Sequence, residues 1–434
     1  MSGQPPLSPM PSPLSSATLG KVRRMLVARL TPEVLNPFDR TPEREQNVRA
    51  TIASILEDPE LELAPVPALI AAVEAAVCGL GPLQTLVDDA EISDILVNAP
   101  DAVFVERAGR LEPAAVRLTS EAELIEIAER IAALAGRELS VAHPIVDARM
   151  ADGSRVNAVL PPVGGPYLAI RKFNRLQLDL APSGTHGRDW VSEGGMSAEM
   201  AEFLTRLVRS KANVLVAGET GAGKTTLLRS LTDLFDPAER VGVVEDTAEL
   251  ALENSDRFNL ETIHPHDLTG TGEAESRLLD VGDLVANALR MRPDRLIVGE
   301  IRLPKEAFYT LQALHTGHDG SATTIHASSA EDALFRLELL ARQSMRDLTV
   351  ADLRTYIARV FDLIVVLRRL RTGRRIVRQI ASLDGVDGDG YRLADVFRAD
   401  LTAAAEEFRF VRDPAWQPSA RLRGRLEAEG ERWT

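Results

Sequence analysis

The stretch Gly218-Glu-Thr-Gly-Ala-Gly-Lys-Thr225 decides how this chain folds. It follows the apolar run Asn213–Ala217 and precedes the helix-like stretch Thr226–Leu231, so a strand, a glycine-rich turn and a helix are predicted in succession. A turn of this kind wraps a polyphosphate with its backbone N–H groups, and the positive end of the following helix faces the same charge. The sequence therefore predicts a phosphate loop that binds a nucleotide.

The residue types within the loop indicate which cofactors it takes. Lys224 is expected to reach the β- and γ-phosphate oxygens, and the Thr225 hydroxyl is suited to Mg²⁺. ATP and Mg²⁺ are therefore the predicted cofactors. The other residues expected to contact the nucleotide within the loop are Gly218, Glu219, Thr220, Gly221, Ala222, Gly223 and Thr226.

The segment around the loop alternates helical patterns with short apolar runs. Strands are predicted at 214–217, 241–244, 295–299, 321–325 and 363–367. Such alternation is typical of a largely parallel sheet whose catalytic loops lie at the carboxyl ends of the strands. The predicted fold class is α/β, with a P-loop ATPase domain over residues 197–390.

Acidic residues end two of these predicted strands. ATP hydrolysis needs a held Mg²⁺, an oriented water and cations that meet the developing charge. Glu245 and Asp246 follow the strand at 241–244, and Glu300 ends the next one. His326 follows a further strand, where an imidazole could sense the γ-phosphate. A zinc site is weakly supported, because no thiolate or regular spacing accompanies the histidines. Those histidines are His315, His318 and His326.

The rest of the chain divides by composition and periodicity. A Pro/Ser-rich lead is expected to be disordered, an α+β domain is expected before the ATPase domain, and a Gly/Pro/Ser-rich stretch between them is expected to be a hinge. The predicted boundaries are 1–20 for the lead, 21–89 for a helical module, 90–176 for the α+β domain, 177–196 for the hinge linker and 391–434 for a charged C-terminal tail.

Composition excludes several function classes. The 434-residue chain has a net charge of −14 and only 4% aromatic residues, so a nucleic-acid motor is disfavoured. Its single cysteine, Cys78, excludes an internal disulfide and indicates a reducing compartment. No apolar run is long enough to span a bilayer, so contact with a membrane is expected only through partners.

Four groups of motifs together resemble the secretion ATPases of type II and type IV systems. They are Gly218–Thr225, Val244–Asp246 with Glu249 and Leu250, Leu289–Arg302, and Thr316–Gly320 with Thr324–Ala327. Upstream motifs resemble the tight-adherence (Flp) pilus assembly branch of that superfamily. These are Ile92–Asn98, Val103–Arg107, Pro144–Arg149 and Asp152–Pro162. The resemblance spans about residues 90 to 390.

The resemblance implies a RecA-like ATPase domain behind a mobile N-terminal domain. It implies a cytoplasmic homohexamer that works at the inner face of the membrane with platform proteins of a pilus or secretion system. Glu245 would activate the attacking water, Glu300 would stand near Mg²⁺, and His326 would sense the γ-phosphate. Arginines that would reach the nucleotide are Arg155, Arg171 and Arg290.

The chain departs from the family at positions where relatives carry arginine. Ile263, Gly282 and Ala286 stand there, and loss of an arginine finger costs on the order of 10³-fold in turnover. These departures make a slow or regulatory paralogue credible, and two alternatives to a pilus motor stay open. One is a conjugative type IV secretion traffic ATPase, and the other is a regulatory paralogue that binds ATP and turns it over slowly.

Overall fold

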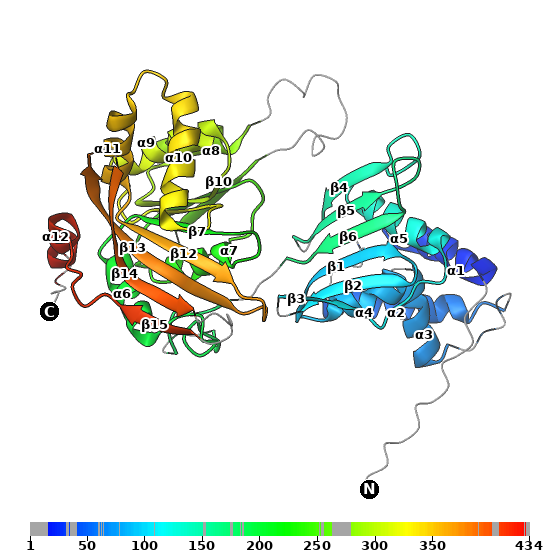
Figure 1. Cartoon of the computed structure of the whole chain (residues 1–434). Helices are drawn as coiled ribbons and strands as arrows, with labels where there is room; N and C mark the ends of the chain where they lie inside the picture. The colour runs from blue at the N-terminus through cyan, green and yellow to red at the C-terminus, as the bar shows by residue number, and fades with distance from the viewer. Residues whose placement is uncertain are drawn as a thin grey trace, which may run out of the picture. The chain divides into compact units, whose positions relative to one another are not determined.

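The chain forms two compact units, residues 1–173 and 174–434, and each is described by itself. Figure 1 shows this computed structural model. The structure describes residues 16–31, 34, 41–59, 61, 63, 65–77, 79–107, 109–150, 153–173, 177–182, 184, 186–250, 252, 256–262, 279–388, 390–401, 408–428 and 430. Among these residues no helix is both long and apolar enough to cross a bilayer.

The first unit begins with a small helical module. Its helices are α1 (Ser16–Arg29), α2 (Pro42–Leu56) and α3 (Pro67–Val77). Val22, Leu26, Ile52 and Val73 are fully buried between them. Because α1 starts at Ser16, the helical module begins inside the stretch 1–20 that the sequence assigned to a disordered lead.

A six-stranded antiparallel sheet makes up the rest of the first unit, in the order β3-β2-β1-β6-β5-β4. The strands are β1 (Ile92–Ala99), β2 (Ala102–Arg107), β3 (Arg110–Pro113), β4 (Ile145–Arg149), β5 (Arg155–Val159) and β6 (Tyr167–Arg171). The short helices η1 (Gly81–Leu83) and α4 (Gln84–Asp88) precede it. Alternate residues of β4, β5 and β6 are buried, so one face of the sheet packs on the helix α5 (Glu121–Leu134). Ser120 caps α5, and its hydroxyl accepts the Glu123 N–H at 3.2 Å.

The second unit is built on a nine-stranded sheet in the order β15-β14-β13-β12-β7-β11-β10-β8-β9. Strands β7 to β12 all run parallel to their neighbours within this group, and β13 to β15 add antiparallel strands beyond β12. The strands are β7 (Val214–Gly218), β8 (Val241–Glu245), β9 (Arg257–Glu261), β10 (Arg295–Ile301), β11 (Ala322–Ile325), β12 (Leu363–Arg369), β13 (Arg375–Asp387), β14 (Gly390–Leu401) and β15 (Phe408–Arg412). The α/β fold class is confirmed.

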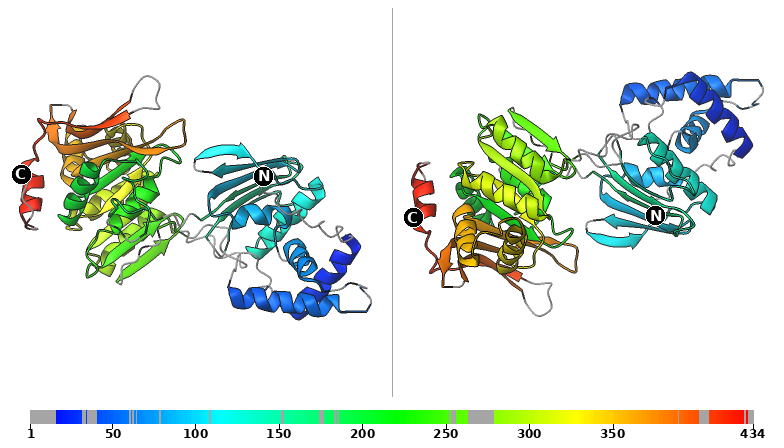
Figure 2. Two further views of the ribbon diagram at one scale, coloured as in Figure 1. Left: turned by 90° about the horizontal axis from the view of Figure 1, so that it is seen from below. Right: turned by 90° about the horizontal axis from the view of Figure 1, so that it is seen from above.

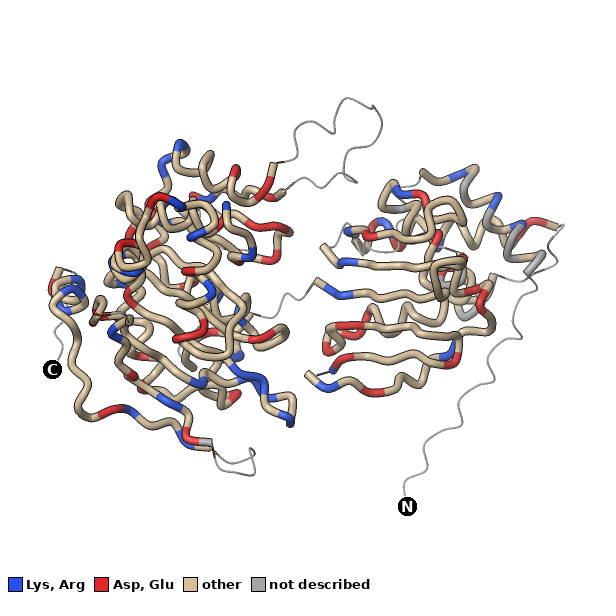
Figure 3. Tube along the Cα trace, turned by 45° about the horizontal axis from the view of Figure 1, so that its top comes forward, with Lys and Arg blue, Asp and Glu red and all other residues tan. Residues whose placement is uncertain are grey.

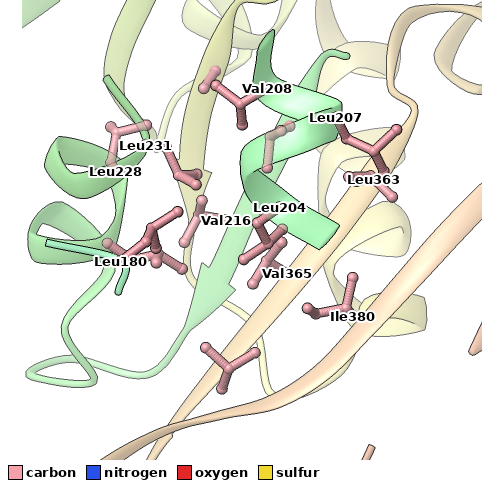
Figure 4. Close-up of a cluster of buried hydrophobic side chains, with 14 of the residues drawn as sticks. Leu180, Leu204, Leu207, Val208, Val216, Leu228, Leu231, Leu363, Val365 and Ile380 are labelled. Atoms are coloured by element: carbon pink, nitrogen blue, oxygen red, sulfur yellow. The ribbon is translucent and has the colours of Figure 1, made fainter. Parts of the chain in front are cut away.

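Helices cover both faces of this sheet, which is why β7 and β8 are buried along their whole length. On one face Val216, Leu204 and Leu228 form a core with Leu363 and Val365 of β12 (Figure 4). On the other face Leu215 packs with side chains of the helices that follow β9. Figure 2 shows the ribbon of this unit from two further directions. The helices are α6 (Ala198–Arg209), α7 (Lys224–Thr232), α8 (Val281–Ala288), η4 (Leu289–Met291), α9 (Pro304–His315), α10 (Ala330–Ser344), α11 (Val350–Val360) and α12 (Ala420–Ala428).

The stretch 177–196 belongs to the core of the second unit and is not the free hinge linker that its composition suggested. Leu178, Leu180 and Trp190 are almost fully buried there. The indole Nε1 of Trp190 donates to Ser230 Oγ of α7 at 3.0 Å. The boundary between the two compact units falls earlier, after Phe173.

The stretch 391–434 is likewise folded over most of its length and is not a separate tail. Strand β14 pairs with β13, and β15 pairs with β14. Trp416 is only 4% exposed; its ring packs edge-on against Phe203 with 5.5 Å between ring centroids, and its Nε1 donates to Ser382 Oγ. The sheet of the second unit therefore extends past residue 390.

Candidate nucleotide-binding site

The predicted phosphate loop joins β7 to α7 in the second unit. Gly221 and Gly223 have φ angles of 73° and 95°, in the left-handed region that favours glycine. Gly223 is the N-cap of α7 and supplies no capping side chain. The first-turn N–H groups of a helix have no partner within the helix, so here they stay available to an anion. The backbone fits a bound phosphate.

Lys224 lies within the loop and is largely buried. Its Nζ is 3.1 Å from Gly218 O, 3.3 Å from Glu219 O and 3.1 Å from His326 Nδ1. An ammonium group has three donors and no acceptor. His326 Nδ1 must therefore accept, which places the imidazole proton on Nε2. This neutral tautomer agrees with the pKa of His326, which burial and then the charge of Lys224 lower.

The same histidine also lies beside Glu300, the residue predicted to stand near Mg²⁺. His326 Nε2 lies 2.8 Å from Glu300 Oε1. Glu300 is at the carboxyl end of β10, and Thr324 Oγ1 of β11 donates to Gly299 O at 2.8 Å, which ties the two strand ends together. Three residues predicted from separate motifs thus form one line across the sheet edge.

Arg302 holds the acidic strand ends in place. Its Nε donates to Glu300 Oε2 at 2.8 Å, and one terminal nitrogen donates to Asp246 Oδ2 at 3.0 Å. Asp246 directly follows β8, so this guanidinium bridges the ends of β8 and β10. An arginine suits this position because its donors fork onto two carboxylates.

Glu245 faces inward and holds the loop that follows β8. It is 3% exposed, and its Oε1 accepts the backbone N–H of Glu249 at 3.0 Å and that of Leu250 at 3.2 Å. Glu249 in turn accepts the Thr225 hydroxyl at 3.3 Å. In this arrangement Glu249 contacts the phosphate-loop threonine, and Glu245 positions Glu249.

Burial changes the acid–base properties of this cluster. It raises the pKa of Glu245 to about 7, against the opposing effect of the two N–H groups that the carboxylate accepts. Burial also lowers the pKa of Lys224, and the charge of Glu300 partly offsets that effect. A carboxyl with a pKa near neutrality is suited to take up a proton from water.

The donor set fits Mg²⁺ in the way that nucleotide sites bind it. Mg²⁺ usually takes one or two protein oxygens and completes its shell with phosphates and waters. Thr225 Oγ1 and the Glu300 carboxylate supply such oxygens. Among the described residues no cluster of three or more His, Cys, Asp or Glu could hold a metal by itself.

The remaining predicted residues lie elsewhere. Arg155 and Arg171 belong to the first unit, where they face each other across β5 and β6, and Arg171 Nε donates to Asp94 at 3.1 Å. Arg290 precedes β10 and is exposed, at the amino end of that strand and so at the sheet edge opposite the phosphate loop. Within one chain, therefore, Arg290 does not join the site. Ile263 lies outside the described residues.

The family follows from comparison with known proteins. A family model described as "Type II/IV secretion system protein" matches residues 77–381, more than half of the chain. The chain belongs to this family. It is 34% identical over 324 residues to the putative conjugal transfer protein MT3759 of Mycobacterium tuberculosis, covering 73% of this chain and 88% of the relative.

Two further proteins are similar to the chain. The type IV secretion system protein PtlH of Bordetella pertussis is 33% identical over 320 residues, covering 69% of this chain and 91% of PtlH. Among solved structures, the VirB11 ATPase of the Brucella suis type IV secretion system is 26% identical, with a TM-score of 0.35; the match covers 77% of this chain and 96% of that chain.

Some contacts of the site escape sequence reasoning. Arg302 belongs to the motif Leu289–Arg302, which resembles the family. Its bridge between two strand ends, however, depends on the order of strands in the sheet. Glu249 is one of several carboxylates after β8, and only its contact with Thr225 distinguishes it. Gly282, where the resemblance leads us to expect arginine, is closely packed, since a Cβ there would lie 2.7 Å from Lys305 Cγ. Lys305 occupies the space that an arginine side chain would need.

Proposed function

We propose that this chain is an ATPase that hydrolyses ATP with Mg²⁺ to power a type IV secretion machine of the conjugal-transfer kind. The observation that carries the proposal is the line from Lys224 through His326 to Glu300, with distances of 3.1 and 2.8 Å. The names of the similar proteins favour conjugal transfer and type IV secretion over the tight-adherence pilus branch that the upstream motifs resemble.

The protein residues of the site divide the work of hydrolysis. The first-turn N–H groups of α7 bind phosphate oxygens, and Lys224 exchanges one of its present acceptors for a phosphate oxygen. Because one of those acceptors is His326, arrival of the γ-phosphate is transmitted to Glu300 through the imidazole. Mg²⁺, when held by Thr225 and Glu300, lowers the charge on the transferred group.

Glu245 is the group best suited to manage the proton of the attacking water. Its pKa of about 7 matches the range in which general bases work well. It also holds Glu249 through the backbone, so Glu249 is the group that orients Thr225. Glu245 is therefore the base, and Glu249 is a positioning residue.

Phosphate release measures the proposed activity directly. Wild-type protein is expected to release phosphate from ATP, and Lys224→Ala is expected to release none above background. Glu300→Gln is expected to retain ATP binding and to lose hydrolysis, because the amide keeps the shape of the carboxylate and lacks its charge. Wild-type protein that binds ATP but releases no more phosphate than Lys224→Ala would support the regulatory paralogue instead.

Assembly and partners belong to the same proposal. We expect a homohexamer, cytoplasmic and peripheral to the inner membrane through platform proteins, as the resemblance implies. Mass photometry with and without ATP tests the hexamer. The pilus alternative keeps one supporting observation, the helical module α1 to α3, which lies almost wholly outside the matched residues 77–381. Neighbouring genes for a short pilin would favour that alternative.

A further inference from the structure

The hairpin formed by β12 and β13 concentrates positive charge beside the phosphate loop. Residues 363–383 contain six arginines and no aspartate or glutamate, and Figure 3 marks these basic positions in blue. Strand β12 runs parallel to β7, with Leu367 in register with Gly218. The residues that follow Leu367 therefore extend past the end of β7 and run alongside the phosphate loop.

Two of these arginines contact the loop itself. Arg375 Nε donates to Gly221 O at 3.0 Å. A Cβ placed on Gly223 would lie 3.1 Å from Arg375 Cδ, and one on Gly221 would lie 3.1 Å from a terminal nitrogen of Arg369. The two guanidinium groups thus stand against the glycines that shape the phosphate-binding backbone.

These two arginines bring like charges close together. Arg369 and Arg375 are directly opposite each other in the antiparallel β12–β13 pair, and both are half-buried. Like charges at such a position are destabilising. The amino end of α7 adds further positive potential at the same place. A bound polyanion would be attracted by both guanidinium groups and by the amino end of α7.

We propose that Arg369 and Arg375 bind the phosphates of the nucleotide from within the same chain, on the side away from the γ-phosphate. The order of strands in the sheet supports this placement, because β12 and β11 are the neighbours of β7 on its two opposite edges. Glu300 and His326 lie on the β10 and β11 side, where the γ-phosphate reacts. The two arginines therefore face the α- and β-phosphates, which ADP and ATP share.

This inference rests on the proposed function, since it assumes a nucleotide in the phosphate loop. It assigns binding to two residues that lie outside the loop and outside the acidic and histidine motifs. It also provides cationic contacts in a chain that has Ile263, Gly282 and Ala286 at positions where the resemblance leads us to expect arginine.

ADP binding without Mg²⁺ tests the proposal, measured by isothermal titration of the full chain in EDTA. Arg375→Gln retains an N–H donor for Gly221 O and removes the charge, whereas Arg375→Lys retains the charge. We expect the glutamine variant to bind ADP about 10-fold or more weakly, the loss expected for one charge-assisted hydrogen bond. The lysine variant should stay within a few-fold of wild type.

Arg369→Gln should weaken ADP binding in the same way. Arg368→Gln is the matched control, because it removes the same charge from the adjacent residue, whose side chain points to the other face of β12. We expect this control to bind ADP as wild type does. Thermal unfolding of each variant shows that the fold is retained.

The outcomes separate the proposal from its alternatives. Wild-type affinity in Arg375→Gln would overturn it, because Arg375 would then only hold the loop backbone. Equal losses in the glutamine and lysine variants, or an equal loss in Arg368→Gln, would also overturn it, since binding would not follow charge at the loop. Failure of the wild-type chain to bind ADP at all would instead reject the proposed function.

Discussion

Glu245 shows how burial sets the behaviour of a single residue. Its carboxyl is 3% exposed and has a pKa of about 7, against an ordinary value of 4.5. Between those two values the folded chain keeps a proton that the unfolded chain has released, so stability falls as the pH rises through this window. The size of the effect is about 3 kcal/mol at most, at about 1.4 kcal/mol for each unit of pKa shift.

We therefore predict that Glu245→Gln makes the stability of the second unit less dependent on pH. Wild type should lose stability as the pH rises from about 4.5 to about 7, and the variant should lose less. Urea unfolding followed by tryptophan fluorescence measures this, because all three tryptophans are in the second unit, at or after Trp190. Parallel pH profiles for the two proteins would contradict the assignment of the shift to Glu245.

His326 is expected to act in turnover rather than in ATP binding. Its imidazole lies between Lys224 and Glu300, so His326→Ala should leave ATP binding nearly unchanged and lower turnover on the order of 10²-fold, as for loss of one transition-state contact. His318→Ala is the control, because its Nδ1 lies 2.9 Å from Ala313 O, outside this line of residues. The measurements are kcat and ATP affinity. Equal effects of the two substitutions would indicate a general loss of structure.

The sequence predicts the residues of the site better than their contacts. Lys224, Glu300 and His326 follow from the rule that parallel strands end at a common edge, and the structure brings them together. The rule gives the ends of strands but not their order in the sheet. Sheet order decides that Arg302 bridges two strand ends and that the β12 hairpin stands beside the loop. Both features depend on residues far apart in the sequence.

At the scale of elements, the same limitation affects the C-terminal region. The charged residues of β14 and β15 make the stretch after residue 390 appear polar, because they lie on faces or edges that stay exposed. Its apolar residues Val396 and Phe397 are nevertheless buried in the core of the second unit, where Phe397 packs against Phe203 of α6. Likewise Trp190 is buried by α7, to which no local pattern in 177–196 points.

The last helix, α12, is fastened to the sheet by a buried ionic cluster. Asp362, just before β12, is fully buried and lies 2.8 Å from Arg421 Nε and 3.4 Å from Arg425 Nε. Arg421 also donates to the carbonyls of Ala358 and Arg359. Removing one member of such a cluster leaves a buried charge without its full set of partners.

Arg421→Ala should therefore lower the free energy of unfolding of the second unit by about 3 kcal/mol or more. The double variant Arg421→Ala with Asp362→Asn should lose less than the sum of the two single losses, because it removes both charges. Urea unfolding followed by tryptophan fluorescence measures these energies. Additive losses would show that Arg421 does not stabilise α12 through Asp362.

At the scale of the whole molecule, the residues predicted to contact the nucleotide are divided between the two units. Every phosphate-loop contact described above lies in the second unit. In the first unit, Arg149, Arg155 and Arg171 form one cross-strand row on β4, β5 and β6. Like charges in a row are unfavourable, although Asp94 offsets part of the repulsion at Arg171. The role that the resemblance gives to Arg155 and Arg171 stays a prediction.

Separating the two units tests this division of labour. The fragment 174–434, a compact unit with its own core, should fold and bind ADP with nearly the affinity of the full chain. Its ATP turnover should fall on the order of 10³-fold, the loss expected when arginines that meet the transferring phosphate are removed. The full chain with both Arg155→Gln and Arg171→Gln should reproduce the loss, and Arg110→Gln, on the outer strand β3, should not. A fragment that hydrolyses ATP at the full-length rate would place all the catalytic arginines in the second unit and leave Arg155 and Arg171 without a role in hydrolysis.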